Sequence, residues 1–253
     1  MPPYARRTRN IYDPASSEPF KLSRSKLDLF LNCPRCFYLD RRLGIAPPPG
    51  PAFTLNVAVD VLLKKEFDIH RAQGTPHPLM HAYGLKAVPF RDPRMGVWRE
   101  NFVGVQHLHT PTNFLVFGAV DDLWVADEGT MIHVVDYKAT SKDGEVELGD
   151  TKWHNQYRRQ MEVYQWLLRK NGLTISDTGY FVYVNGKKDR AAFDGRLEFD
   201  VKLIPYRGSD GWVEGALTAA AACLNGHAMP AASAECEFCA YRALAVTAEK
   251  TIT

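Results

Sequence analysis

Two short segments of the sequence place carboxylates at the ends of apolar runs. Asp121 ends Gly118-Ala119-Val120-Asp121, and Asp136 follows fifteen positions later in Asp136-Tyr137-Lys138. The apolar residues before each acid indicate two adjacent buried strands. Lys138 shares a strand face with Asp136, because side chains alternate with a period of two. Buried carboxylates need a compensating charge, commonly a divalent cation, so this grouping suits metal-assisted hydrolysis of a phosphodiester. A salt-bridged strand pair is the alternative.

A helix expected at 152–170 follows these strands. One of its faces carries two polar side chains, Gln160 and Tyr164, at i, i+4 spacing among larger apolar ones: Trp153, Tyr157, Met161 and Leu168. A buried glutamine needs hydrogen-bond partners, and an active site opposite this helix would supply them. A core-facing helix with two polar tips is the alternative.

Periodicity and turn residues predict the elements that position these groups. Residues 1–20 read as a poorly ordered tail, 27–31 as an amphipathic segment preceded by Ser23 and Ser25, and 47–51 as a stiff proline-rich linker. The segment 74–111 shows no clear periodic element. The expected elements are a helix at 54–73, strands at 112–126 and 131–138, the helix at 152–170, strands at 178–185 and 196–204, and helices at 210–225 and 236–248. This order predicts an α/β fold with a mixed central sheet flanked by helices.

Four of the five cysteines form two Cys-x-x-Cys pairs near opposite ends of the chain. The pairs are Cys33 with Cys36 and Cys236 with Cys239, and 199 residues separate them; Cys223 reads as a core thiol. Joining the pairs would connect the first helix to the C-terminal helices. Four thiolates suit either tetrahedral zinc or a [4Fe–4S] cluster.

Composition indicates an ordinary globular protein. The chain has 253 residues, 45% hydrophobic and 24% charged, with a net charge of +2. No apolar run approaches the ~18 residues of a membrane span, so no membrane partner is expected. The N-terminus lacks a signal-peptide core, so we expect a cytoplasmic protein. Residues 1–42 hold nine Lys/Arg against four acids, a basic region that could attract phosphate. No phosphate-cradling Gly-x-x-x-x-Gly-Lys-Ser/Thr loop is present.

The ordered set of motifs resembles a known family. Gly118-x-x-Asp121, Asp136-Tyr137-Lys138 and Gln160-x-x-x-Tyr164 resemble the RecB-type branch of the PD-(D/E)XK nuclease superfamily, over roughly residues 22–242. The segments 23–27 and 33–39 resemble the first helix of its iron–sulfur members, which include the nuclease domains of AddB-type repair complexes and CRISPR adaptation exonucleases. The resemblance implies one domain over 21–248 with a restriction-endonuclease-like core. It also implies a helical cap clipped by a four-cysteine metal site.

The resemblance also implies roles for individual residues. Asp121 and Asp136 would bind Mg²⁺ or Mn²⁺, with the backbone carbonyl of Tyr137 as a third ligand. Lys138 would orient the attacking water, supported by Gln160 and Tyr164, which would also position the substrate strand.

Two features depart from the family pattern. Asp60 stands where the family usually has a metal-binding histidine, and it could still serve a second ion. The family's iron–sulfur members use one early and three late cysteines, whereas this chain has two and two; we favour [4Fe–4S], with Zn²⁺ as the alternative.

The sequence therefore predicts a Mg²⁺/Mn²⁺-dependent deoxyribonuclease acting on single strands or DNA ends. One alternative is a catalytically impaired nuclease-like module that only binds DNA, which Asp60 supports. Another is a redox or sensor protein built on the cysteines, which leaves the buried carboxylate pair unexplained.

Overall fold

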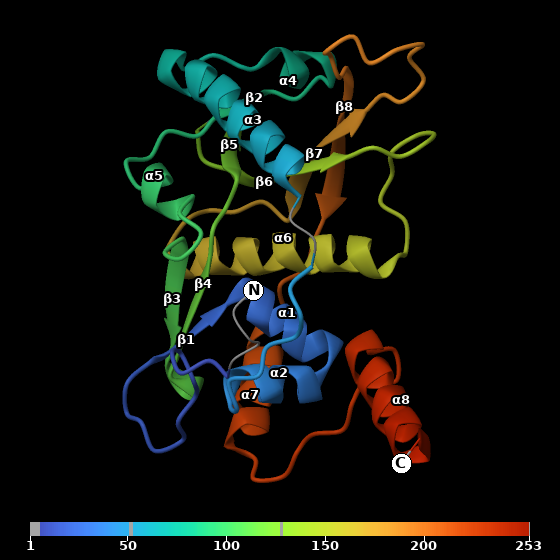
Figure 1. Ribbon diagram of the computed structural model, residues 1–253. Helices are drawn as coiled ribbons and strands as arrows, with labels where there is room; N and C mark the ends of the chain where they lie inside the picture. Colours follow the sequence, from blue (N-terminus) through green and yellow to red (C-terminus); the bar gives the residue numbers. More distant parts are fainter. Residues whose placement is uncertain (1–5, 51–52, 127–128, 253) are drawn as a thin grey trace. The chain divides into compact units, whose positions relative to one another are not determined.

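The computed structural model describes residues 6–50, 53–126 and 129–252 (Figure 1). Its contacts divide the chain into two compact units. The first unit comprises Met1–Gly50, His107–Phe117 and Gly211–Thr253, and the second comprises Pro51–Gln106 and Gly118–Asp210. The single domain expected over 21–248 stays a prediction.

A five-stranded mixed sheet organises the second unit, with the order β2-β5-β6-β7-β8 (Figure 1). The strands are β2 (Ala87–Pro89), β5 (Asp122–Ala126), β6 (Ile132–Thr140), β7 (Thr178–Gly186) and β8 (Phe199–Arg207). Strands β6 and β7 are parallel, and the other neighbours are antiparallel. Parallel strands need a long crossover, and helix α6 (Lys152–Lys170) lies in that connection. The predicted α/β fold with a mixed sheet flanked by helices is confirmed.

The single strand predicted over 112–126 is wrong, because this stretch forms two strands in different sheets. β4 (Phe114–Gly118) belongs to a three-stranded sheet of order β1-β4-β3, whereas β5 joins the five-stranded sheet. In the three-stranded sheet, β1 (Phe20–Ser23) runs parallel to β4, and β3 is Val105–His109. The apolar content of a segment does not reveal where a chain leaves one sheet for another.

Helix α3 (Thr54–Gln73) has the predicted bounds and packs one row of side chains on the sheet. Phe67 is fully buried, and Val59 and Leu63 pack against the same core cluster. Leu55 and Leu62 of the same helix are 58% and 62% exposed. The apolar side chains of α3 cover a wider face than the part of the helix that contacts the sheet. Only the row of Val59, Leu63 and Phe67, spaced by four residues, therefore packs against the core.

Helix α6 also has the predicted bounds and ends at Asn171. Its buried stretch runs from Met161 to Leu168. Trp153, predicted on the same face, is 65% exposed, because it lies in the first turn before this stretch.

The first unit contains four helices, β1 and the parts of β3 and β4 that fall within His107–Phe117. The helices are α1 (Arg24–Asn32), α2 (Pro34–Arg41), α7 (Val213–Asn225) and α8 (Glu237–Ile252). Asp40 in α2 is fully buried and pairs with Arg41 at 3.0 Å, Lys26 at 2.8 Å and Arg7 at 2.9 Å. Of the predicted tail, residues 1–5 lie outside the described residues, and Tyr12 donates its hydroxyl to Asn225 at 3.0 Å.

Short elements occupy the segment 74–111, in which the sequence shows no clear periodic element. They are α4 (Pro78–Ala82), β2, α5 (Met95–Trp98), β3 and the 3-10 turn η1 (Thr110–Thr112). Elements of three to five residues are too short to show a period. Pro51 of the predicted linker lies outside the described residues. Within the described ranges, no helix is long and apolar enough to span a bilayer.

Candidate active site

Strand β6 brings Asp136 and Lys138 to one face of the sheet. Val135 and Tyr137 belong to the core cluster on which α3 packs, so the alternating Asp136 and Lys138 face α6. Asp136 is fully buried, and the Lys138 ammonium contacts its carboxylate. Burial by itself lowers the pKa of Lys138, but the charges of Asp136 and Asp121 more than offset this and raise it. Lys138 is therefore an ammonium at neutral pH.

Asp121 lies level with Asp136 on the neighbouring strand. Asp122 pairs with Val135 in the antiparallel register, so Asp121 is opposite Asp136 one step beyond the start of β5. One oxygen of Asp121 accepts the backbone N–H of Tyr137 at 3.0 Å. The Asp121 side chain is 21% exposed, so solvent reaches the carboxylate.

A lysine from α3, which the sequence reasoning did not single out, joins two of the acids. The ammonium of Lys64 lies 2.8 Å from Asp60 Oδ2 and 3.2 Å from Asp121 Oδ1. Burial, followed by the charge of Asp121, raises the pKa of Asp60. Burial alone lowers the pKa of Lys64, but both carboxylates offset this and raise it. The i, i+4 spacing of Asp60 and Lys64 was the available signal for this pair.

Helix α6 supplies the polar partners of Lys138. The ammonium donates to Gln160 Oε1 at 3.3 Å, and Gln160 Nε2 donates to the Tyr164 hydroxyl at 3.1 Å. The ring of Tyr157 lies 4.5 Å from the same ammonium. Gln160 and Tyr164 thus lie on the face of α6 that contacts Lys138, and their role in an active site stays a prediction.

The neighbouring acid Asp122 points to the opposite face of β5, where its partners are other side chains of the protein. It is fully buried and pairs with Arg99 at 3.0 Å and with Arg71. It also accepts the Tyr137 hydroxyl at 2.8 Å. Burial first, and then the charge of Asp122, raise the pKa of Tyr137 well above its ordinary value. The two arginines neutralise Asp122. Of the two neighbouring acids, Asp121 is therefore the one whose carboxylate faces the candidate active site.

The family model of the PD-(D/E)XK nuclease superfamily matches residues 70–244. This chain belongs to the PD-(D/E)XK nuclease superfamily. It is similar to a crystal structure described as "Putative exonuclease" from Eubacterium rectale, with 14% identity, 87% of each chain covered and a TM-score of 0.44. No curated protein matches the sequence. The RecB-type branch stays a prediction.

The donors of this site fit the divalent metal that PD-(D/E)XK nucleases use. Asp121 and Asp136 offer carboxylate oxygens, and the backbone of Tyr137 lies between Asp136 and Lys138. Hard oxygen donors of this kind suit Mg²⁺ and Mn²⁺. Asp60 adds a third carboxylate, which is linked to Asp121 through Lys64.

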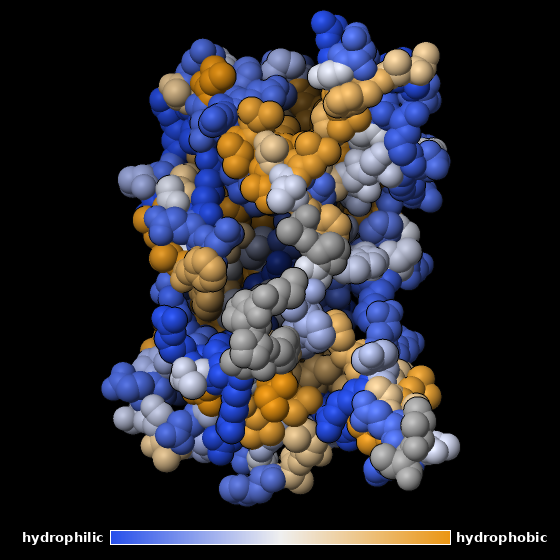
Figure 2. Space-filling view, in the orientation of Figure 1, coloured by the Kyte–Doolittle hydropathy of each residue, from blue (hydrophilic) through white to orange (hydrophobic). Residues whose placement is uncertain are grey.

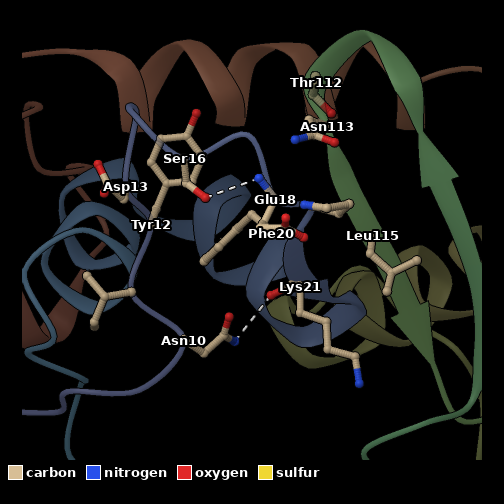
Figure 3. Close-up of a pocket in the computed structure, with 12 residues that line it drawn as sticks. Asn10, Tyr12, Asp13, Ser16, Glu18, Phe20, Lys21, Thr112, Asn113 and Leu115 are labelled. Atoms are coloured by element: carbon tan, nitrogen blue, oxygen red, sulfur yellow. Dashed lines mark hydrogen bonds between the residues drawn. The ribbon is translucent and has the colours of Figure 1, made fainter.

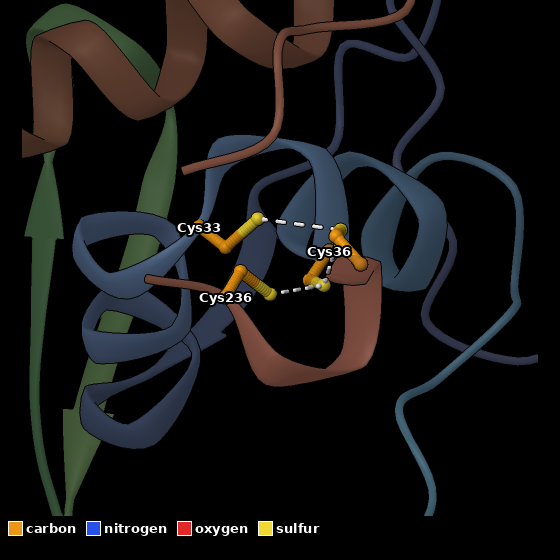
Figure 4. Close-up of side chains that lie close together, drawn as sticks. Cys33, Cys36 and Cys236 are labelled. Atoms are coloured by element: carbon orange, nitrogen blue, oxygen red, sulfur yellow. Dashed lines mark hydrogen bonds between the residues drawn. The ribbon is translucent and has the colours of Figure 1, made fainter. Parts of the chain in front are cut away.

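The four predicted cysteine ligands of the nuclease come together in the first unit (Figure 4). Cys33 ends α1, Cys36 lies in the first turn of α2, and Cys236 and Cys239 lie at the start of α8. All four sulfurs lie within 4.8 Å of one another. The distances are 3.8 Å for Cys33–Cys239, 3.5 Å for Cys36–Cys236 and 3.6 Å for Cys36–Cys239. These four thiols can bind a metal.

The backbone around Cys33 favours its thiolate, the form that binds metals. Burial alone raises the pKa of Cys33, but backbone hydrogen bonds from Ser233 and Cys36 help to lower it to about 6. The fifth cysteine, Cys223, lies with its sulfur 3.9 Å from the Pro34 carbonyl, and burial raises its pKa. It is not part of the four-sulfur cluster.

A cavity of about 550 Å³ in the first unit lies between the segment 10–21 and residues 112–115 (Figure 3). Asn10 donates to the Lys21 carbonyl at 3.2 Å, and the Glu18 N–H donates to Ser16 at 3.2 Å. These bonds order the segment itself. Among the described residues that line the cavity, none belongs to the predicted site.

Proposed function

We propose that this superfamily member is a Mg²⁺- or Mn²⁺-dependent deoxyribonuclease that hydrolyses phosphodiester bonds in single strands or at DNA ends. The observation that carries the proposal is the alignment of Asp121 with Asp136 on neighbouring strands, with the Lys138 ammonium against Asp136. Asp121, Asp136 and the Tyr137 carbonyl would hold the metal. When bound, the metal lowers the pKa of a coordinated water and shields the phosphate charge.

The chain's own groups would orient the reactants. Lys138 compensates negative charge that develops on the phosphate and holds the attacking water near the acids. Gln160 fixes the Lys138 ammonium through a hydrogen bond, and Tyr164 fixes Gln160 in turn. This chain of contacts makes Gln160 and Tyr164 positioning residues, because they act through Lys138.

Substitution of the site tests the proposal. Asp136→Asn and Lys138→Ala should each abolish metal-dependent degradation of single-stranded DNA, because the first weakens a metal ligand and the second removes the positive charge beside the reacting phosphate. Circular dichroism and the thermal unfolding midpoint check that the variants remain folded. The matched controls are Asp143→Asn and Lys188→Ala, an exposed acid and base that pair at 3.0 Å elsewhere. Full activity in both site variants refutes the assignment.

A second candidate function is a DNA-binding module without catalysis. The ion pairs of Lys64 favour it, because this ammonium occupies the side of Asp60 and Asp121 that a metal would need. A nuclease assay with Mn²⁺ separates the two functions. Tight DNA binding with no cleavage by the wild-type protein would identify the module.

We propose that the four-cysteine centre holds a structural metal. With Zn–S bonds of about 2.3 Å, tetrahedral thiolates lie about 3.8 Å apart, close to the 3.5–3.8 Å distances here. The [4Fe–4S] cluster implied by the resemblance would require the sulfurs to spread around a cube of iron and sulfide. Analysis of zinc, iron and acid-labile sulfide in anaerobically purified protein decides between them. We propose a cytoplasmic location, because cysteines that bind a metal as thiolates suit a reducing compartment.

A further inference from the structure

We propose that a groove beside Lys138 binds the unpaired bases of a single-stranded nucleic acid. This inference deepens the proposed function and depends on it for the position of the phosphate. The groove has a volume of about 410 Å³, within the range of small-molecule sites. It lies in the second unit, and we call it the base groove. Its walls include Phe53, Leu55 and Asn56 at the start of α3, Thr140 at the end of β6, and Trp153 and Tyr157 of α6.

Aromatic and apolar side chains of the base groove are unusually exposed. Phe53 is 63% exposed, Trp153 is 65% exposed and Leu55 is 58% exposed. Figure 2 shows apolar side chains gathered over α3. A single exposed apolar residue needs no explanation, but here several of them line one cavity. Aromatic faces that stand open to solvent in a groove are the platforms on which unpaired bases stack.

The base groove is continuous with the candidate active site. The ring of Tyr157 lines the groove and also lies 4.5 Å from the Lys138 ammonium. Directly after Lys138, the last two residues of β6 and the following Ser141 form part of the groove wall. A strand whose phosphate lies at Lys138 would therefore place an adjacent base against this wall.

The chemistry of the wall suits a base better than a phosphate. Among the described residues that line the groove, none carries a charge, while Asn56, Thr140 and Ser141 offer polar atoms. In a duplex the base faces are stacked inside the helix and cannot reach such a wall without flipping. The groove therefore selects an unpaired strand.

Hydrogen bonds hold the groove in shape. Asn56 donates to the Ala139 carbonyl at 2.9 Å, which fastens the start of α3 to the end of β6. Ser141 donates to the Gly186 carbonyl at 3.0 Å, which fastens β6 to β7. A wall that is formed before binding loses less entropy when the ligand arrives.

Fluorescence anisotropy of labelled oligothymidylate and of a duplex of equal length, with EDTA present, tests the proposal. Trp153→Ala and Phe53→Ala should each raise the Kd for the single strand between about 5-fold and about 150-fold, the loss of one stacked base. The Kd for the duplex should not change, and Trp153→Phe should restore single-strand binding. The control is Phe102→Ala, which removes an 84% exposed aromatic side chain outside the groove. A strand of abasic sugar phosphates should bind the wild type and Trp153→Ala equally.

Two results would overturn the inference: unchanged single-strand affinity in Trp153→Ala and Phe53→Ala, or equal losses for single strand and duplex. A cleavage assay with Mg²⁺ or Mn²⁺ on the same wild-type preparation separates this inference from the proposed function. Cleavage by a wild type whose groove variants bind normally refutes only the groove. Selective loss of single-strand binding without any wild-type cleavage supports the groove and refutes the nuclease.

Discussion

Replacing Lys64 by methionine should strengthen metal binding at the active site. The Lys64 ammonium neutralises Asp60 and Asp121, at 2.8 Å and 3.2 Å. A divalent ion bound at Asp121 must displace or repel that ammonium. Methionine keeps most of the apolar stem and removes the charge, so the carboxylates would attract the metal without this competition.

The size of the effect follows from the contacts of Lys64. At an effective dielectric constant of about 20, unit charges at such distances attract by several kcal/mol. The three side chains are between 21% and 32% exposed, so solvent weakens this attraction. A net change of about 1–2 kcal/mol corresponds to a Kd for Mn²⁺ that falls by about 5- to 30-fold.

Titration calorimetry with Mn²⁺ measures the change, and the thermal unfolding midpoint with and without metal provides a second readout. Because the acids repel one another without Lys64, metal-free Lys64→Met should unfold at a lower temperature and gain more from added metal than the wild type. The control is Lys65→Met, which removes an exposed charge from the next position of α3. An unchanged or weaker affinity in Lys64→Met would show that the ammonium does not compete with the metal.

Three further predictions concern other parts of the molecule. Gln160→Leu should lower kcat about 10-fold with little change in KM, because one hydrogen bond to the charged Lys138 is worth about 1.5 kcal/mol; steady-state kinetics check this, and a pure KM effect would contradict it. Cys236→Ser should lower both the amount of bound metal and the thermal unfolding midpoint, whereas Cys223→Ser should change neither. Equal losses in the two variants would show that the metal binds elsewhere. Burial alone raises the pKa of Asp40, but its cationic partners lower it, so its stabilising contribution is present above about pH 4 and is lost as the pH falls through the depressed pKa. Between about pH 5 and pH 2, the urea unfolding midpoint should therefore fall less in Asp40→Asn than in the wild type. The same fall of the midpoint in both proteins would contradict this.

Long periodic segments were predictable because their pattern is local. The helices at 54–73 and 152–170 have the predicted bounds, and β6 and β7 lie within two residues of theirs. The break between β4 and β5 was not predictable, because apolar runs lie on both sides of Asp121 and Asp122 and only strand pairing assigns the two runs to different sheets. The exposure of Leu55 and Trp153 also was not predictable, because a position on a helix face does not reveal which part of the helix contacts the rest of the protein.

The sequence by itself determined which groups share a face. Alternation along one strand places Lys138 beside Asp136, and a spacing of four in one helix places Gln160 beside Tyr164. Only the tertiary structure decided that α3 brings Lys64 to Asp121, that arginines neutralise Asp122, and that two cysteine pairs 200 positions apart meet. The physical reason is the range of the interactions: backbone geometry sets relations within an element, whereas relations between elements depend on how their surfaces pack.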